Sequence, residues 1–554
     1  MKKSYLHRIL LLVLLLTVSI LSTGCTPQEA AAPTPASISP ATTQPTASPV
    51  PTSTPILPQP RLYIDPVIPD FYQESLTLPA NWEQTEEADA ANLTLSINTQ
   101  QPQTRLIYAL VAPFNTIDDN ITSTDLRALW QGTTPAIASA QHLLVSRSTL
   151  NAFEALWGPP SSKTVTFLNQ RQFSQRAWRK ENHWAILPFQ DLDAQWKVIA
   201  VDDQSPIHKG FAPTTYALTL PVALQQTAPI DEAALEALTL PPSNYDPEKL
   251  VTVNLTGVTA LVRATAGLME YLGTTYPATD IRDILIEADI THINNEVPFS
   301  PSCPLPVEYQ TSLVFCSRPD YIELLEDIGA DVIELSGDHF QDWGPDAVRY
   351  TLDMYNQRGW HYYGGGADLD DAQQPALFEI KGTKLAFLGC NAKPKGYARA
   401  SETNPGAMHC DMDWMTEQVT ALSEDGYLPI VTFQHLEYYS YEIHPILQED
   451  FRKMADAGAV IVSGSQAHIP QAVELYEESF LHYGLGNLFF DQYNESKETR
   501  QAFIDRHVFY NGEHIATELL TIEFTDYAHS QPMSLESRQS LLDIIFDVSL
   551  WDWN

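Results

Sequence analysis

Basic residues are scarce in this sequence, and their scarcity limits the partners that the protein can attract. The 554 residues include 31 lysines and arginines against 69 aspartates and glutamates, which gives a formal net charge of −38. Such a charge repels nucleic acids, anionic lipid surfaces and other polyanions at long range. We therefore expect no nucleic-acid partner, and we interpret the acidic surface mainly as a source of solubility.

The apolar stretch near the start of the chain is too short for a membrane-spanning helix. It runs from Ile9 to Leu21, about a dozen residues, whereas a helix needs roughly 20 to cross the hydrocarbon core of a bilayer. Basic residues precede it, and the small residues 22–24 stand between it and Cys25. This order is typical of a cleaved export signal, which we favour over a permanent transmembrane helix.

The small residues before Cys25 resemble the lipobox of bacterial lipoproteins, although Ser22 stands where a leucine is usual. In that motif the cysteine is acylated after cleavage. The resemblance implies that residues 1–25 are a lipoprotein signal peptide with its lipobox. It also implies that lipidated Cys25 anchors the protein to the outer face of the bacterial cell membrane. An ordinary secreted protein with an incidental cysteine is the alternative.

Charge is almost absent from residues 26–60, where Glu29 is the only charged residue among ten prolines and many Thr, Ser, Ala and Gln residues. Such a segment cannot bury enough apolar surface to fold, so we predict an extended linker. The remaining residues, roughly 495, exceed what one hydrophobic core usually organises and predict two or three domains.

Residues 61–225 predict a mixed α/β domain. Apolar runs predict strands at 106–112, 184–188 and 197–201, and residues 122–130 predict a helix that Ser123 opens. The phrases "LIYALVAPFNTIDDNITSTDLRALWQG" and "WAILPFQDLDAQWKVIAVDDQSPI" resemble parts of phosphate-type periplasmic solute-binding proteins. The resemblance implies two α/β lobes around a cleft for a small anionic ligand. Because we recognise no Ser/Thr/Gly phosphate loop, a degenerate binding or interaction domain is the alternative.

A Pro-Pro-Ser-Asn break within residues 226–248 predicts a second linker, and the rhythm changes after it. Strand and helix signals alternate through 249–530, as is typical of a layered α/β domain. Strands are predicted at 250–255, 290–293, 332–335, 385–388, 430–433 and 460–462. Helices are predicted at 280–287, 320–328, 345–357, 414–422 and 449–457. We interpret residues 531–554 as a C-terminal extension.

Cysteine is also rare, with four residues besides Cys25. An even number in an exported protein favours disulfides. The simplest of the three connectivities joins sequence neighbours, Cys303 to Cys316 and Cys390 to Cys410, and four free buried thiols are the alternative.

Polar residues with metal-binding or proton-transfer capacity follow several predicted strands. Loops at the carboxyl ends of strands line the ligand crevice of open α/β sheets, so we expect these residues to converge. Imidazoles and carboxylates together suit a divalent metal ion. The residues in question are Asn294, Asn295, Glu296, Asp338, His339, Asp342, Asn391, Gln434, His435, Glu437, Gln466 and His468.

These segments, among them "ADITHINNEVPF", "GADVIELSGDHFQDWG", "VTFQHLEYY", "DAGAVIVSGSQAHIPQAVE" and "HYGLGNLFFD", resemble the CapA family of poly-γ-glutamate capsule synthesis proteins over about 250–492. The resemblance implies a calcineurin-like metallophosphatase fold, a β-sandwich flanked by helices. Carried over residue by residue, it implies Asp338, His435 and His468 as metal ligands with Glu296 nearby. It implies His339 as a catalytic general acid, and divalent Mn, Fe or Zn as the cofactor.

The chain departs from the family pattern at several positions, two of which bear on the number of metal ions. Val258 stands where the opening strand usually ends in Gly-Asp, and Gln466 replaces a histidine. A standard two-metal centre is therefore in doubt. We expect the neighbouring amides Asn294, Asn391, Gln434 and Gln466 to bind substrate. Lys393 and Lys395 form a basic loop that could receive an anionic substrate, and a solvated loop held by a Cys390–Cys410 bond is the alternative.

Two functions fit these observations. In the first, a surface-anchored CapA-like lipoprotein works with capsule biosynthesis machinery in the synthesis, release or attachment of an extracellular polymer, as a metal-dependent hydrolase or transferase. In the second, the metallophosphatase-like core is degenerate and the protein is a non-catalytic scaffold or ligand-binding module. Val258 and Gln466 favour the second function.

Overall fold

The computed structural model describes residues 59–551 except 136–137, 180–181, 311 and 394–397. They belong to one compact unit that spans Leu57–Asn554. The predicted export signal, Cys25, most of the first linker and Lys395 lie outside the described residues. Within the described ranges, no helix combines the length and apolar character needed to span a bilayer.

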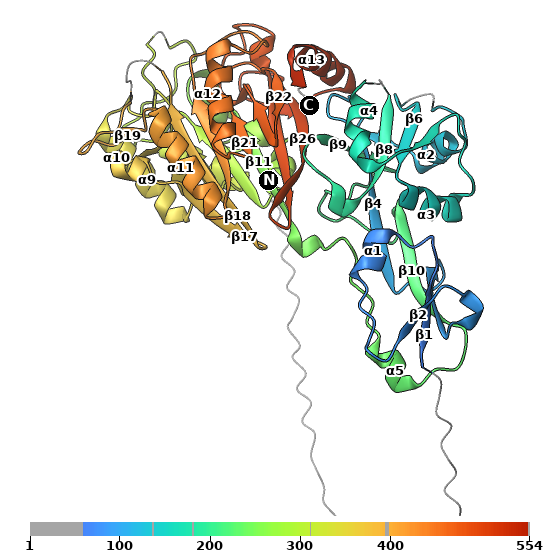
Figure 1. Cartoon of the computed structure of the whole chain (residues 1–554). Helices are drawn as coiled ribbons and strands as arrows, with labels where there is room; N and C mark the ends of the chain where they lie inside the picture. The colour runs from blue at the N-terminus through green and yellow to red at the C-terminus, as the bar shows by residue number, and fades with distance from the viewer. Residues whose placement is uncertain (1–58, 136–137, 180–181, 311, 394–397, 552–554) are drawn as a thin grey trace, which may run out of the picture. The chain divides into compact units, whose positions relative to one another are not determined.

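The first region is an α/β domain built on one mixed sheet, drawn in blue to green in Figure 1. The strand order is β2-β1-β3-β10-β4-β8-β6-β7, with β9 beside β4 and β5 beside β9. The strands are β1 (Arg61–Ile64), β2 (Glu83–Thr85), β3 (Leu93–Ile97), β4 (Thr104–Pro113), β5 (Asn120–Ile121), β6 (His142–Val145), β7 (Val165–Phe167), β8 (His183–Pro188), β9 (Trp196–Val201) and β10 (Thr219–Gln226). The helices are α1 (Asp70–Ser75), α2 (Ser123–Trp130), α3 (Arg147–Trp157), α4 (Phe173–Arg179) and α5 (Glu232–Ala237).

Strand β4 organises this region because its residues from Leu106 to Pro113 are all buried. It pairs antiparallel with β10 along its first half and with β8 and β9 along its second half. Helix α2 begins after Thr122, whose side chain accepts a hydrogen bond from the backbone N–H of Asp125 and thereby caps the helix. The predicted helix and strands of this region are therefore present within one or two residues of their expected bounds.

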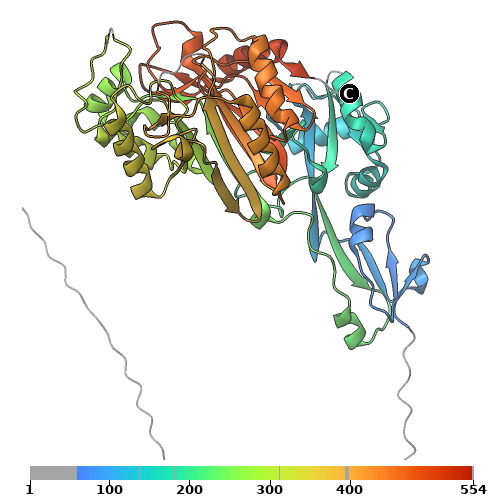
Figure 2. The same cartoon turned by 60° about the vertical axis from the view of Figure 1, so that its left-hand side comes forward.

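The second region contains two large sheets, visible as yellow-green to red strands in Figures 1 and 2. One runs β15-β14-β13-β11-β25-β26-β27, with β12 between β13 and β24. Its strands are β11 (Leu250–Thr256), β12 (Val258–Thr259), β13 (Ile290–Asn295), β14 (Val332–Glu334), β15 (His361–Tyr363), β24 (Asn487–Phe489), β25 (Gln501–Tyr510), β26 (Glu513–Phe524) and β27 (Ser530–Pro532).

The other large sheet runs β17-β18-β20-β21-β23-β22-β28. Its strands are β17 (Ala376–Ile380), β18 (Thr383–Asn391), β20 (Leu428–Gln434), β21 (Ile461–Ser463), β22 (Val473–Tyr476), β23 (Ser479–His482) and β28 (Leu550–Trp551). A short ribbon joins β16 (Gly365–Gly366) to β19 (Gly406–Ala407). The helices are α6 (Arg263–Leu272), α7 (Arg282–Ile286), α8 (Ile322–Asp327), α9 (Pro345–Arg358), α10 (Leu369–Ala372), α11 (Met412–Glu424), α12 (Pro445–Asp456) and α13 (Leu535–Val548).

Three apolar clusters show that this region is a sandwich of sheets with helices outside. The cluster between the sheets joins Val253 and Val332 of the first sheet to Phe387 and Ile430 of the second. A second cluster packs helices α6, α8 and α9 on the outer face of the first sheet, and a third packs α11 and α12 on the second. Alternate strand residues point to opposite faces, so both faces of each sheet are apolar. The predicted α/β class and helix-flanked sandwich are confirmed.

The segment after β24 forms strands and a helix that are not predicted from the sequence. Strands β25 and β26 pair along their length and meet at Asn511-Gly512, where both residues have positive φ. Helix α13 contributes Leu541, Leu542 and Ile545 to the cluster between the sheets, and β28 pairs with β22. Residues that we interpret from sequence as a C-terminal extension thus contribute to the sandwich itself.

This region contains two disulfides among the described residues. Cys303 pairs with Cys316 and Cys390 pairs with Cys410. The second bond attaches the end of β18 to the loop just before α11, and so holds the base of the loop that carries Lys393. The pairing is the neighbour-to-neighbour connectivity among the alternatives that the sequence leaves open.

Candidate functional site

The two large sheets bring several strand ends to one place. Strands β13 and β14 are parallel neighbours in one sheet, and β18, β20 and β21 are parallel neighbours in the other. Glu296 follows β13, and Asp338 with His339 follow β14. The close approach of these two loops depends on Gly337, since a Cβ there would lie 2.9 Å from the Cα and the carbonyl oxygen of Glu296.

Glu296, Asp338 and His339 form the acidic cluster of this site. One ligand atom from each residue can be chosen so that all lie within 4.8 Å of one another. Glu296 is only 3% exposed. Two carboxylates and an imidazole are the donor types that divalent transition metals accept, so the cluster suits such an ion in chemistry and spacing.

Amide side chains fix the orientation of these acids. Gln466 Nε2 donates to Glu296 Oε1 at 2.6 Å, and Gln434 accepts from the backbone N–H of Asp338 at 3.0 Å while donating to its carboxylate. The oxygens Gln466 Oε1 and Asn294 Oδ1 are buried and have no hydrogen-bond partner among the described residues. Amide oxygens are neutral ligands for hard cations, so these two unpaired acceptors also fit a bound cation.

Lys393 places a positive charge directly in this site. Its ammonium lies 2.8 Å from Asp338 Oδ2 and 2.6 Å from Glu437 Oε1. Burial disfavours the ammonium, but the charges of Asp338 and Glu437 outweigh it and raise the pKa of Lys393. Burial likewise disfavours ionised Asp338, yet Lys393 holds the pKa of that carboxyl below its usual range. Lys393 therefore neutralises a carboxylate that a metal ion would also need.

The other two cluster residues have pKa values moved upward. Burial raises the pKa of Glu296 to about 8. Burial disfavours the imidazolium of His339, but its hydrogen bond to Asp342 and the charges of Glu296 and Asp338 outweigh this and raise its pKa to about 9. The hydrogen bond joins His339 Nδ1 to Asp342 Oδ2 at 2.6 Å. Asp342 thus fixes the ring and favours its charged form.

His435 has protein partners at both ring nitrogens. The backbone N–H of Leu436 donates to Nδ1 at 2.9 Å, so the proton is on Nε2, which lies 2.9 Å from Asp450 of α12. The structure therefore directs this predicted ligand to Asp450, and His435 is not a member of the acidic cluster.

His468 lies at the edge of the site. Its Nδ1 is 2.9 Å from Asn487 Oδ1, and its Nε2 is 3.7 Å from Glu437 Oε2. The ring stacks on Phe490 with centroids 5.1 Å apart, and burial lowers its pKa. His468 consequently faces the carboxylate that Lys393 also contacts.

Of the other predicted substrate-binding residues, Asn391 supports the loop that carries Lys393. Its Oδ1 accepts from the backbone N–H of Lys393 at 3.0 Å, and its Nδ2 donates to the carbonyl of Ser336 at 2.9 Å. Asn294 donates to Ser465 Oγ at 3.3 Å. Both amides therefore position the strand-end loops on which the cluster residues lie.

An apolar patch lies beside the site at the position of the missing aspartate. Val258 on β12 is fully buried and pairs with Asn294 in register. It belongs to a small cluster with Val262, Val297, Phe315 and Phe490. Phe315 also lies edge-on to the His339 ring at 4.9 Å between centroids. This side of the site offers no ligand, so the described residues favour one metal position over two.

Two strand-end residues that the sequence predicts to converge on the site, without a specific role, also act in it. Asp342 orients His339, and Glu437 binds Lys393. Their spacing is visible in the sequence, since Asp342 lies three residues after His339 and Glu437 two residues after His435. Only the fold shows that Asp342 contacts His339 and that Glu437 contacts Lys393.

A family model described as "Bacterial capsule synthesis protein PGA_cap" matches residues 252–492, the segment that carries all of these residues. We call this segment the CapA-like domain because it is similar to that family. Over 278 residues, 49% of this chain and 67% of the relative, the sequence is 24% identical to the capsule biosynthesis protein CapA of Bacillus anthracis. It is 25% identical over 198 residues to the PGA biosynthesis protein CapA of Bacillus subtilis (strain 168), covering 35% of this chain and 52% of that relative.

Solved structures are similar to parts of the chain at low identity. A 5′-nucleotidase precursor from Thermus thermophilus aligns with 54% of this chain and 59% of its own, at 13% identity and a TM-score of 0.32. An ABC-type phosphate transport receptor from Vibrio cholerae aligns with 28% of this chain and 78% of its own, at 14% identity and a TM-score of 0.24. The architecture of the CapA-like domain is accordingly defined by its own strand order and apolar clusters.

Proposed function

We propose that this protein takes part in the synthesis, release or attachment of a poly-γ-glutamate-type extracellular polymer, as an exported lipoprotein anchored through Cys25. The relatives of the CapA-like domain are named as capsule or PGA biosynthesis proteins. The observation that carries the proposal is the cluster of Glu296, Asp338 and His339 at the strand ends of that domain. Its partners would be the membrane, through the lipid, and the machinery that handles the polymer.

Residues of the cluster divide the chemistry between them. Glu296 and Asp338 would hold a divalent ion, Mn, Fe or Zn, which when bound supplies a Lewis acid and an activated water. His339 donates a proton to the leaving group, with Asp342 holding Nδ1 so that Nε2 is the donor. Lys393 attracts an anionic carboxylate or phosphoryl group of the substrate, while Gln434 and Gln466 keep the acids in place.

The test combines metal content with polymer handling. The protein without residues 1–58 is purified without chelator, and Mn, Fe and Zn are measured in the parent and in Asp338→Asn. Hydrolysis of poly-γ-glutamate and of a phosphodiester is then assayed with each ion. Asp346→Asn is the matched control, since Asp346 lies fully exposed in the first turn of α9. We expect about one ion per chain in the parent and control, and none in Asp338→Asn.

A non-catalytic scaffold is the second candidate, and two observations favour it. Lys393 already neutralises Asp338, and Val258 makes one wall of the site apolar. A scaffold would bind no metal with any of the three ions, and capsule formation in cells would be the same with Asp338→Asn as with the parent. Loss of surface polymer in Asp338→Asn with normal protein levels would contradict the scaffold.

The lipid anchor has its own test. Cells grown with an alkyne-labelled fatty acid should label the parent protein, and Cys25→Ser should abolish the label and release the protein from the membrane fraction. Labelling of Cys25→Ser to the parent level would contradict the proposed anchor.

A further inference from the structure

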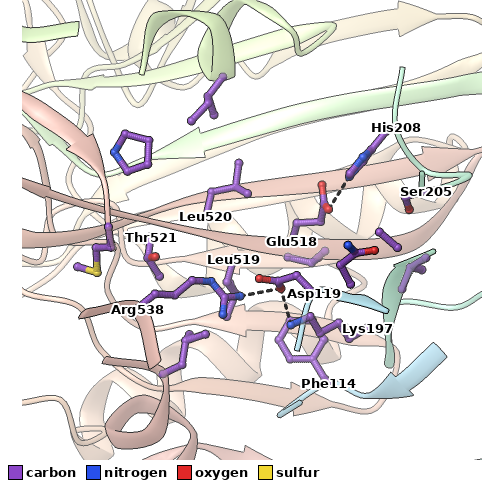
Figure 3. A pocket seen from close by; sticks show the side chains of 18 of the residues that line it. Phe114, Asp119, Lys197, Ser205, His208, Glu518, Leu519, Leu520, Thr521 and Arg538 are labelled. Atoms are coloured by element: carbon purple, nitrogen blue, oxygen red, sulfur yellow. Dashed lines mark hydrogen bonds and ion pairs between the residues drawn. The ribbon is translucent and has the colours of Figure 1, made fainter. Parts of the chain in front are cut away.

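A cavity separate from the strand-end cluster shares no residue with it. Its volume is about 400 Å³, which is within the range of small-molecule sites. Residues from the β4–β5 connection, β9 and the loop after it form one side, and β26, β27 and α13 form the other. Figure 3 shows side chains from both sides directed into the space between them.

The wall of this cavity is largely apolar. Leu519 and Leu520 come from β26, and Leu542 and Phe546 come from α13. Phe114 adds an aromatic ring from the residue just after β4. A wall of this composition favours an alkyl or aryl group, because burying it removes apolar surface from water.

Asp203 is exposed and accepts a hydrogen bond from Asn120, and the other charged groups around the cavity contact one another. Asp119 accepts from Lys197 at 2.7 Å and from Arg538 at 2.8 Å, as Figure 3 shows. Lys197 also donates to the carbonyls of Thr116 and Ile117, so each of its three donors has an acceptor. His208 Nε2 lies 2.7 Å from Glu518 Oε1. A charged ligand would enter the cavity without a counter-ion of its own.

Two polar atoms of the lining, in contrast, are unpaired. Ser205 is 3% exposed, and its Oγ has no hydrogen-bond partner in the part of the chain that the structure describes. Glu518 Oε2 is also buried and has no hydrogen-bond partner there, and Arg506 Nη1 lies 3.8 Å from it. A buried hydroxyl and a buried carboxylate oxygen without partners cost free energy unless another molecule supplies the missing hydrogen bonds. The Ser205 hydroxyl can donate a hydrogen bond, and Glu518 Oε2 can accept one.

We propose that this cavity binds a small amphipathic molecule with an alkyl or aryl body and one uncharged hydrogen-bonding group, an amide or a hydroxyl. The body lies against Leu519, Leu542 and Phe546. The polar group donates to Glu518 Oε2 and accepts from Ser205 Oγ. The proposal is independent of the chemistry at Glu296, Asp338 and His339.

The test uses N-phenyl-1-naphthylamine, a neutral probe with two apolar ring systems and one N–H, whose fluorescence rises in an apolar site. We expect saturable binding of one probe per chain to the protein without residues 1–58. Leu520→Trp fills the cavity and should weaken binding roughly tenfold or more. Leu535→Trp is the matched control, since Leu535 on α13 is 84% exposed and lies outside the lining, and it should bind like the parent.

Ser205→Ala tests the polar end without changing the wall. It should weaken the binding of octanamide, measured by displacement of the probe, by about fivefold while its circular dichroism and melting temperature match the parent. Octanamide and octanol should displace the probe better than octanoate or octylamine. The proposal is overturned if the parent shows no saturable binding, if Leu520→Trp folds and binds equally well, or if the charged compounds compete best. If Leu520→Trp does not fold, Ser205→Ala decides.

Discussion

The strand-end cluster and the separate cavity both contain buried charged groups, and these charges are neutralised in different ways. Around the cavity Asp119 contacts Lys197 and Arg538, and Glu518 contacts His208. In the cluster, Glu296 has an amide partner and an upward-shifted pKa, and Lys393 serves two carboxylates. Paired charges stabilise a binding wall, whereas under-compensated charges are characteristic of sites that take up ions or move protons.

Replacing His339 should have the largest of the expected effects, a loss of turnover, if the cluster is catalytic. With His339→Gln we expect turnover to fall by about 10²–10⁴-fold, since the general acid is lost. The measurement is the steady-state rate with whichever polymer or ester the parent hydrolyses, alongside the melting temperature. His361→Gln, at an exposed position on β15, is the control. An unchanged rate in His339→Gln would remove this residue from the mechanism.

Removing the shared carboxylate beside the cavity should destabilise the fold. Asp119→Ala leaves Lys197 and Arg538 mostly buried without their acid, and we expect a loss of about 2 kcal/mol in the free energy of unfolding. The estimate is below that for a fully buried pair because Asp119 itself is half-exposed. Denaturant unfolding measures it. Glu83→Ala, which breaks the exposed pair with Arg61, should cost at most about 1 kcal/mol. Equal losses in the two variants would show that the ion pairs of Asp119 stabilise the fold no more than an exposed ion pair does.

The stability contributed by Glu296 in the cluster and by Lys197 beside the cavity should depend on pH in opposite directions. The folded pKa of Glu296 is raised from 4.5 to about 8, so folding binds a proton between those values and stability falls as pH rises through that window. The pKa of Lys197, which burial lowers from 10.5 to about 8, gives stability that increases as pH rises from about 8 to 10.5. Between pH 4.5 and 8, the free energy of unfolding should fall by a few kcal/mol less in Glu296→Gln than in the parent. A parent-like slope in that variant would place the titration elsewhere.

Replacing Lys393 should give the smallest of these effects, a change in the affinity for a metal ion. Lys393→Met removes a cation that competes for Asp338, so the affinity for Mn²⁺ should rise by roughly tenfold. Isothermal titration calorimetry on the apo protein measures it. Lys163→Met, at an exposed position in the first region, is the control and should match the parent. An affinity that falls in Lys393→Met would mean that Lys393 supports the site by ordering Asp338.

Much of the fold follows from local pattern. The runs ending at Asn295 and Gln434 are buried on both faces, and they become central strands of the two sheets. The β25–β26 hairpin is not among the predicted elements, although Asn511-Gly512 is a strong two-residue turn signal. Helix α13 is not predicted as part of the domain, because only its packing into the apolar cluster between the two large sheets identifies it as such.

The sequence by itself determined the alternation of strands and helices and the residues that follow the strand ends, because backbone periodicity and turn chemistry act over a few residues. Tertiary structure alone decided that His435 turns to Asp450, that Lys393 bridges Asp338 and Glu437, and that Ser205 and Glu518 line one cavity. Hydrogen bonds and ion pairs depend on distances of a few ångströms between residues far apart in the chain. Those distances are set only when the sheets and helices pack.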